Sequence, residues 1–459
     1  MGLKIMDKFR NLFFAFIIIQ PILDIITTLS INYFNLSVTI GVIVRVLFMG
    51  LTLVVIILSP KSRLKNWVLS YLFLLFASIG IGFIYNIFAK PVFSFFTEAQ
   101  FLTKALYFPI LFSALFMAYD FTKEQEVEKS KLLRSVSIAT IIISITLFVA
   151  VLTGTSGNTY PYLKAGYKGW FFAGNELGAI IAITFPLLLI FASIKMKQLH
   201  KWYYWLPVFF LGITGVLVGT KVSYFSVLLS TIIFLFSLAA AWFFDKNKRT
   251  YLLNLLLAAI FLAVFLGSTP FSPSYTNFTG DFERLPSGDE TANEDEEDVE
   301  EDPSGDKKED KFAAEDLGIL NVLLSSRNIY FVGFLNYYDE ADMAQKLFGM
   351  GYAGNYPEKP KLIEMDFFDF FFSFGIIGFL LYLIPFFLLV WVIISTLIKN
   401  WKLVFNVENI LLASSIVLGL GIAFLAGHVL SAPAVSIYLS LPMVLLLRNL
   451  INGPKQEID

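Results

Sequence analysis

Apolar runs of about twenty residues recur along most of the chain and are separated by short polar segments. A helix needs roughly twenty apolar residues to cross the hydrocarbon core of a bilayer, and helices satisfy their own backbone hydrogen bonds there. The pattern therefore predicts an all-α polytopic membrane protein with about twelve transmembrane helices. The predicted spans cover residues 11–29, 38–59, 67–88, 102–119, 135–153, 171–194, 203–219, 222–244, 251–268, 366–398, 409–427 and 430–449.

Composition supports this class of protein. Of the 459 residues, 57% are hydrophobic and 15% are charged, and the mean hydropathy is +0.72. Such a chain is too apolar to be a water-soluble domain. Because cysteine is absent, disulfides and thiolate metal sites are excluded. The net charge of −2 gives no reason to expect a nucleic-acid partner.

Basic residues fall on one side of the predicted spans. They cluster at Lys4/Lys8/Arg10, Lys61/Arg63/Lys65, Lys123/Lys129/Lys131/Arg134, Lys195/Lys197/Lys201, Lys246/Lys248/Arg249, Lys399/Lys402 and Arg448/Lys455. Under the positive-inside rule this side is the cytoplasm, so both termini are expected there. The chain then divides into transmembrane helices 1–9 (residues 1–268), an extracytoplasmic loop (269–365), transmembrane helices 10–12 (366–450) and a cytoplasmic tail (451–459).

Two kinds of sequence follow one another in the loop. Residues 289–310 form a low-complexity acidic run, which we expect to be disordered because it has too little apolar area to offset its chain entropy. The alternative is a calcium site, but the run lacks the spaced ligands and central glycine of a calcium loop. Beyond it, helical spacing of apolar residues predicts amphipathic helices on the outer surface of the membrane. These residues are Leu317, Leu320, Leu323, Leu324, Tyr330, Phe331, Phe334 and Leu335.

Two charged residues lie inside the first two predicted spans. Asp24 is about five residues from the outer end of the first span and Arg45 about seven residues into the second, which places both roughly 8–10 Å below the outer surface. Ionisable groups within membrane spans are costly and often mark functional sites. A structural Asp24–Arg45 ion pair that joins the two helices and a role in substrate binding are both open.

Four further polar residues map to the same level. Asn175 and Glu176 begin the sixth span, Lys221 lies at the hinge between the seventh and eighth spans, and His428 lies at the end of the eleventh. Structural alternatives exist for these residues too. A lysine can extend its ammonium group to the headgroup level, and a single histidine often has a purely structural role.

Three carboxylates, Glu364, Asp366 and Asp369, stand at the beginning of the tenth span, and Arg327 lies among apolar neighbours in the loop. Carboxylates in a first helical turn complement the helix dipole and the unpaired N–H groups, which accounts for one or two of the three. A cavity in the outer leaflet would combine these groups, offering cations to a lipid-linked phosphate and a carboxylate or histidine to a hydroxyl group. Arginine suits phosphate because its planar fork donates two parallel hydrogen bonds.

Several short motifs resemble those of the O-antigen ligase and polymerase family, which includes teichuronic acid and other surface-polysaccharide polymerases. The motifs are Gly174-Asn175-Glu176-Leu177-Gly178, Gly219-Thr220-Lys221, Ser325-Ser326-Arg327, Gly349-Met350-Gly351 and Phe374-Gly375-Ile376-Ile377-Gly378. The similarity covers most of the chain from the fifth span onward. It implies a GT-C-like glycosyltransferase on the outer face of the bacterial cytoplasmic membrane, without metal or cofactor, that uses an undecaprenyl-pyrophosphate-linked glycan as donor.

The resemblance also implies roles for single residues. In the family a basic residue at the hinge and an arginine in the large loop engage the pyrophosphate, which carries over to Lys221 and Arg327. Ligases have a histidine, taken as the base, where this chain has Glu364, and they usually have arginine at the hinge where this chain has lysine. The candidate bases are therefore Glu364, Asp366 and His428, and the candidate substrate-binding residues are Lys221, Arg327, Arg45, Asn175 and Glu176.

The expected function is polymerisation of polysaccharide repeat units by one inverting displacement at the anomeric carbon. An acceptor glycan, the bilayer and other polysaccharide-export proteins are the expected partners. The alternatives are ligation of a finished glycan to a different acceptor, and a lipid-linked oligosaccharide flippase or other transporter. A transporter should carry its polar residues near the bilayer midplane, whereas here they crowd toward one leaflet.

Overall fold

The computed structural model describes residues 2–34, 38–120, 125–160, 164–244, 248–284 and 327–453. The acidic run, the four leucines between 317 and 324, and Ser325 and Ser326 lie outside these residues. Within the described ranges, twelve segments are long and apolar enough to cross a membrane. The prediction of an all-α polytopic membrane protein is thereby confirmed.

Thirteen helices form these twelve segments, because α14 and α15 together make one. They are α1 (Gly2–Phe34), α2 (Ile40–Leu58), α3 (Arg63–Ala89), α4 (Phe95–Asp120), α5 (Gln125–Leu152), α6 (Gly174–Lys195), α7 (Leu206–Val218), α8 (Lys221–Phe244), α9 (Lys248–Ser268), α14 (Asp366–Tyr382), α15 (Ile384–Val404), α16 (Val407–Leu425) and α17 (Pro433–Asn452). Polar residues cap several of them: Ser62, for example, accepts a hydrogen bond from the Lys65 N–H group at 3.0 Å at the start of α3.

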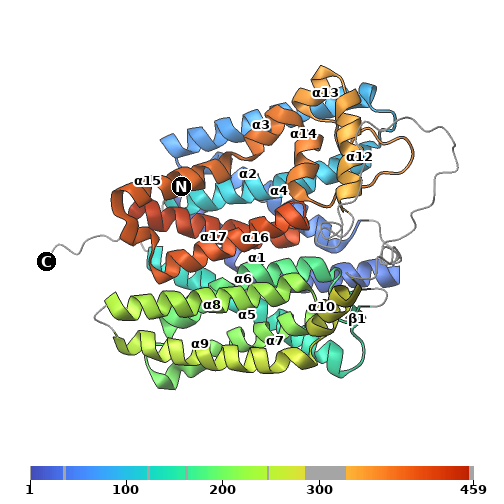
Figure 1. Ribbon diagram of the computed structural model, residues 1–459. Coiled ribbons are helices and arrows are strands. Elements are labelled where there is room, and N and C mark those ends of the chain that lie inside the picture. Colours follow the sequence, from blue (N-terminus) through green and yellow to red (C-terminus); the bar gives the residue numbers. More distant parts are fainter. Residues whose placement is uncertain are drawn as a thin grey trace.

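The long helices run side by side in one common direction (Figure 1), and α4, α6 and α17 are the most buried of them. Both termini lie toward one end, called the terminal end below. The opposite end, called the loop end, carries short elements. These are β1 (Gly157–Asn158) paired antiparallel with β2 (Tyr167–Gly169), η2 (Thr269–Phe271), α10 (Pro273–Arg284), α12 (Arg327–Glu340) and α13 (Met343–Phe348); η1 (Leu199–Trp205) leads into α7.

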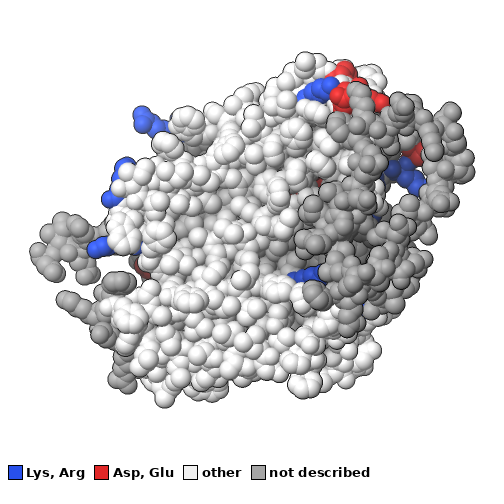
Figure 2. Space-filling model, in the orientation of Figure 1, with Lys and Arg blue, Asp and Glu red and all other residues white. Residues whose placement is uncertain are grey.

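Charged side chains follow this division into two ends. Figure 2 shows coloured groups on the left and on the right of the molecule, with a wide white belt between them. Such a belt fits a bilayer, because charged groups are costly in the hydrocarbon core.

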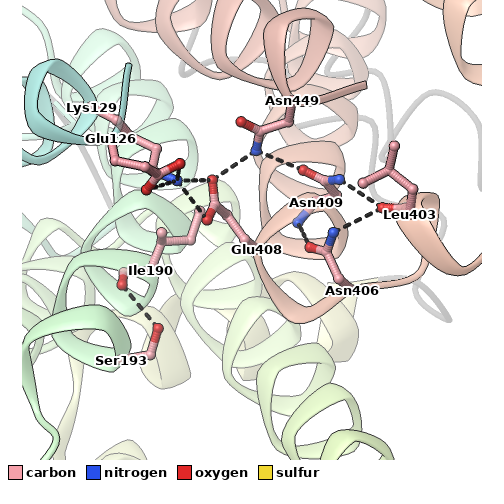
Figure 3. A network of polar contacts seen from close by, with 9 residues as sticks. All are labelled: Glu126, Lys129, Ile190, Ser193, Leu403, Asn406, Glu408, Asn409 and Asn449. Atoms are coloured by element: carbon pink, nitrogen blue, oxygen red, sulfur yellow. Dashed lines mark hydrogen bonds and ion pairs between the residues drawn. The ribbon is translucent and has the colours of Figure 1, made fainter. Parts of the chain in front are cut away.

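At the terminal end, partly buried polar contacts join several helices (Figure 3). Both carboxylate oxygens of Glu408 on α16 accept from Lys129 Nζ of α5 at 2.9 Å, and Oε1 also accepts from Asn449 Nδ2 of α17 at 2.7 Å. Arg10 of α1 pairs with Glu128 of α5 at 3.3 Å. Removing one partner of a buried pair leaves an uncompensated charge, so these contacts hold the terminal end in one arrangement.

Helix α12 confirms the helical spacing predicted for the loop around Phe331 and Phe334. Phe334 is buried, and its ring lies 5.4 Å from that of Phe372 on α14. Met350 and Tyr356 belong to the same apolar cluster. The loop therefore has a small core of its own, packed on the first turns of α14.

Helix α14 is broken at Gly375, where φ is 65° and ψ is −176°, a conformation essentially restricted to glycine. The span predicted over 366–398 is one membrane segment, but its helix is interrupted at this point. A break leaves carbonyl groups without helical partners. Here the N–H of Met350 donates to the carbonyl of Phe372 at 2.9 Å, and the N–H of Gly351 donates to that of Ser373 at 3.2 Å. The loop thus inserts into the break.

A buried ion pair fixes the other side of this insertion. Lys90 Nζ lies 2.5 Å from Glu98 Oε1, and the two side chains are 1% and 4% exposed. Lys90 also donates to the carbonyl of Tyr352 at 2.7 Å, and Glu98 accepts from the Tyr352 N–H at 2.7 Å. Each charge therefore has a backbone partner besides its counterion, which offsets part of the cost of burial.

Candidate functional site

Glu364 lies just before α14, and three cationic side chains surround its carboxylate. Arg327 Nη2, from the first residue of α12, is 3.4 Å from Oε2. His428 Nε2, from the segment between α16 and α17, is 3.8 Å from the same oxygen, and Lys361 Nζ is 3.9 Å from Oε1. Three segments distant in sequence therefore meet at one carboxylate. The Glu364 side chain is 34% exposed, so it stays accessible to a ligand.

Backbone conformations at this meeting point are unusual. Glu364 and His428 both have positive φ, at 63° and 58°. This left-handed region costs non-glycine residues energy and is found at functional sites more often than elsewhere. A Cβ on Gly427 would lie 2.5 Å from the Glu364 carbonyl oxygen, so the two segments cross in direct backbone contact.

Asp366 holds the segment that carries His428. Its Oδ2 accepts from the N–H groups of Val429 at 2.8 Å and Leu430 at 2.7 Å, and its Oδ1 accepts from Ser431 Oγ at 2.5 Å. The residue is 1% exposed. Its hydrogen-bonding capacity is directed at the protein, which indicates a positioning role rather than that of a base.

Asp369 has a similar structural role. It accepts from the N–H groups of Ile363 at 2.9 Å and Met365 at 3.1 Å, on either side of Glu364. Both aspartates thus accept from backbone N–H groups, but the donors lie outside α14 rather than in its first turn, where the sequence placed them. Of the three carboxylates, only Glu364 is partly exposed.

The charges set the protonation of the pair formed by Glu364 and His428. The His428 ring lowers the pKa of the Glu364 carboxyl, and Arg327 and Lys361 add to this against the opposing effect of burial. Burial disfavours the charged form of His428, but Glu364, Asp366 and Glu176 together outweigh it and raise the pKa of the imidazole. The carboxylate form of Glu364 and the imidazolium form of His428 therefore support each other.

The Asp24–Arg45 ion pair is confirmed, with Arg45 Nη2 2.5 Å from Asp24 Oδ1 and Arg45 Nε 3.0 Å from Gln20 Oε1. Helix α1 continues to Phe34 rather than ending near residue 29. Asp24 therefore lies about 15 Å along the axis from the end of its helix.

Glu176, in the first turn of α6, connects the ion pair to the Glu364 site. It interacts electrostatically with Asp24, Arg45 and His428. Asp24 and Glu176 line a small pocket together with Phe171 and Phe172, which precede α6. The structure thus pairs Arg45 with Asp24 and His428 with Glu364, and Glu176 interacts electrostatically with both pairs' members.

A family model described as O-antigen ligase like membrane protein matches residues 6–452. The chain belongs to this family. Searches of curated proteins and of solved structures gave no significant match. Membership places the chain among membrane proteins that ligate or polymerise glycans.

Lys221 lies at the predicted hinge between α7 and α8. Gly219 ends α7 with a φ of 79°, and α8 begins at Lys221. The hinge packs on α6, since a Cβ on Gly178 would lie 2.9 Å from Thr220 Oγ1. Asn175 is exposed in the first turn of α6. The ion pairs of Glu364 are formed with Arg327, Lys361 and His428. That Lys221 and Arg327 line one pocket therefore stays a prediction.

Sequence reasoning missed two cations at this site. Lys361 lies three residues before Glu364 in the loop, and no sequence motif distinguishes it from other loop lysines. Lys104 lies on α4 and interacts electrostatically with Glu176. A lysine two residues inside the predicted span 102–119 was the available signal, because ionisable residues in spans are rare. The carboxylates therefore have more positive charge around them than the sequence motifs indicated.

Proposed function

We propose that the protein polymerises polysaccharide repeat units, taking an undecaprenyl-pyrophosphate-linked glycan as donor and a second glycan as acceptor. The observation that carries this proposal is the convergence of Arg327, Lys361 and His428 on Glu364 at the loop end. An accessible carboxylate beside several cations suits a reaction that removes a proton from a hydroxyl group and releases a phosphate.

The proposed step is a single displacement. The acceptor hydroxyl oxygen forms a bond to the anomeric carbon of the donor, and the bond from that carbon to the pyrophosphate oxygen breaks with its electron pair. Glu364 takes the hydroxyl proton. Arg327 and His428 move from Glu364 toward the pyrophosphate and stabilise its growing charge. When the donor is bound, Arg327 and His428 no longer lower the pKa of the Glu364 carboxyl, so the carboxylate becomes a stronger base.

Topology supports an enzyme over a transporter. A transporter must open alternately at its two ends. Opening the terminal end here would separate the ion pairs Lys129–Glu408 and Arg10–Glu128. The Glu364 site lies at the loop end, which we propose faces away from the cytoplasm, with both termini in the cytoplasm of a bacterium.

Ligation is the second candidate, and one observation favours it. Ligases resembling this chain have a histidine where Glu364 stands, and here His428 reaches the same place from another segment, 3.8 Å from Oε2. A carboxylate and an imidazolium together can serve either acceptor. We prefer polymerisation because the residue at the position of the ligases' histidine is Glu364 in this chain.

The test replaces Arg327, Lys221 and Glu364 singly by alanine in cells and measures surface polymer length and lipid-linked intermediates. Accumulation of single lipid-linked repeat units is expected for a polymerase. Full-length chains stranded on the lipid carrier would instead indicate a ligase. Unchanged polymer with folded protein in all three variants would refute the site.

A further inference from the structure

We propose that a groove between α7 and α9 binds the isoprenoid chain of the lipid-linked donor, with the α7–α8 hinge at its polar end. The cavity is about 320 Å³ in volume. Its walls include Phe209 and Ile213 of α7 and Phe261 and Phe265 of α9, and Pro273 of α10 closes it at the loop end. This inference rests on the proposed function, because it assumes a donor attached to a lipid.

The groove faces the bilayer and has an apolar surface. Ile213 and Val264, on opposite walls, are 45% and 52% exposed, and both lie in membrane-spanning segments. A hollow among membrane-facing side chains loses dispersion contacts unless a hydrocarbon chain fills it. The occupant is therefore a hydrocarbon chain rather than a sugar.

Close helix packing builds the wall of the groove. Gly212 allows the ring of Phe261 to approach α7, since a Cβ there would lie 2.5 Å from Phe261 Cζ. That ring packs at 5.3 Å from Phe209 and 5.8 Å from Phe265. The three rings support one another, so the groove has a rigid side against which a methyl-branched chain can pack.

The position of the groove favours the chain of the donor over ordinary lipid. Its closed end adjoins the hinge, where a Cβ on Gly219 would lie 3.2 Å from Pro273 Cβ. Asn277 Nδ2 of α10 also donates to the Gly219 carbonyl at 2.9 Å. Lys221 follows two residues later, and an ammonium group is a good partner for phosphate. A chain lying in the groove would therefore emerge beside a lysine at the start of α8.

Contacts continue from the hinge toward the site. Thr220 packs on Gly178 of α6, and Glu176, two residues earlier in that helix, interacts electrostatically with His428. A donor with its chain in the groove and its pyrophosphate at the hinge would carry its sugar toward Glu364. The hinge end of the groove thus packs on α6, the helix that carries Glu176.

The experiment fills the groove and varies the length of the donor chain. Ile213→Trp adds bulk inside the groove, and Val264→Trp does so from the facing wall. Ile260→Trp is the matched control, because Ile260 is also 45% exposed on α9 but does not line the groove. The purified full chain in lipid nanodiscs is given the same pyrophosphate-linked repeat on an eleven-isoprene or a two-isoprene chain.

For wild type we expect kcat/KM to be higher with the long chain. Ile213→Trp and Val264→Trp should lower it about tenfold or more for the long chain and leave the short-chain value unchanged, and Ile260→Trp should behave as wild type. Equal long-chain values in all four proteins would overturn the groove and leave the transferase intact. A wild-type protein inactive with both donors would refute the proposed function, and the groove assignment with it.

Discussion

Oε2 of Glu364 and Nε2 of His428 lie 3.8 Å apart, although the two residues belong to separate segments on either side of α14, α15 and α16. Both have left-handed backbones. Gly427 packs against the carbonyl of Glu364, so the contact is built from main chain as well as side chains. A change at either residue is therefore expected to alter the other.

The first prediction concerns the base. Glu364→Gln keeps the size of the side chain but cannot take a proton, so kcat should fall by about 10²–10⁴-fold with little change in donor affinity. The measurement is the initial rate of glycan transfer by the reconstituted protein. Glu358→Gln is the control, because Glu358 is an exposed carboxylate of the same loop. A Glu364→Gln variant as fast as the control would remove Glu364 from the mechanism.

The second prediction concerns pH. Glu364 has a lowered pKa, so its contribution to stability is present above the unfolded pKa of about 4.3 and is lost as pH falls through the folded value. His428 has a raised pKa, so its contribution is complete below about 6.5 and is lost as pH rises through the folded value.

The variant His428→Asn tests the effect of His428 protonation on the reaction rate. Asparagine tolerates the left-handed backbone but does not titrate. Wild-type kcat/KM should decline on the alkaline side as the imidazolium loses its proton, and the variant should lack that decline. The measurement is a pair of pH–rate profiles. An identical alkaline limb in both proteins would show that another group titrates there.

The third prediction separates positioning from catalysis. Asp366→Ala removes all three acceptor contacts to residues 429–431, so His428 should lose its place and the alkaline limb should shift. Asp366→Asn should restore it, because the amide oxygen can accept from Val429 and Leu430 and the amide nitrogen can donate to Ser431. A purely structural aspartate would change the yield of folded protein without moving the pH profile.

The fourth prediction concerns the break in α14. A Cβ on Gly375 would lie 2.5 Å from the Leu347 carbonyl carbon, and its φ of 65° with extended ψ strains any other residue. Gly375→Ala should cost at least about 3 kcal/mol of unfolding free energy. Gly421→Ala, in α16 with nothing within 4 Å of the added Cβ, should be neutral or stabilising by up to about 1 kcal/mol. Equal unfolding temperatures would contradict the account of the break.

Hydropathy was enough to predict the membrane helices, because each span must be apolar whatever it packs against. The Asp24–Arg45 ion pair could also be predicted from the sequence, since both charges stand near the same end of neighbouring spans. The helix at Phe331 and Phe334 followed from spacing alone. These features depend on local pattern or on adjacent elements.

The site depended on contacts that no pattern reveals. Glu364 and Asp366 are two residues apart, yet one is accessible and the other is fully engaged with residues 429–431. That difference arises where the segment carrying His428 crosses the one before α14. The break at Gly375 could not be predicted from the sequence, because it depends on a distant loop. The N–H groups of Met350 and Gly351 in that loop donate to the carbonyl groups that the break leaves without helical partners.

The most direct test of the central claim is the product formed from a single defined substrate. The purified protein in proteoliposomes is given lipid-linked single repeat units and nothing else, and the lipid-linked products are sized by mass spectrometry. We expect a ladder of two, three and more repeats with wild type, and unreacted single units with Arg327→Ala and Glu364→Gln. Single units left unchanged by folded wild-type protein, or a ladder equally long with Glu364→Gln, would contradict the account.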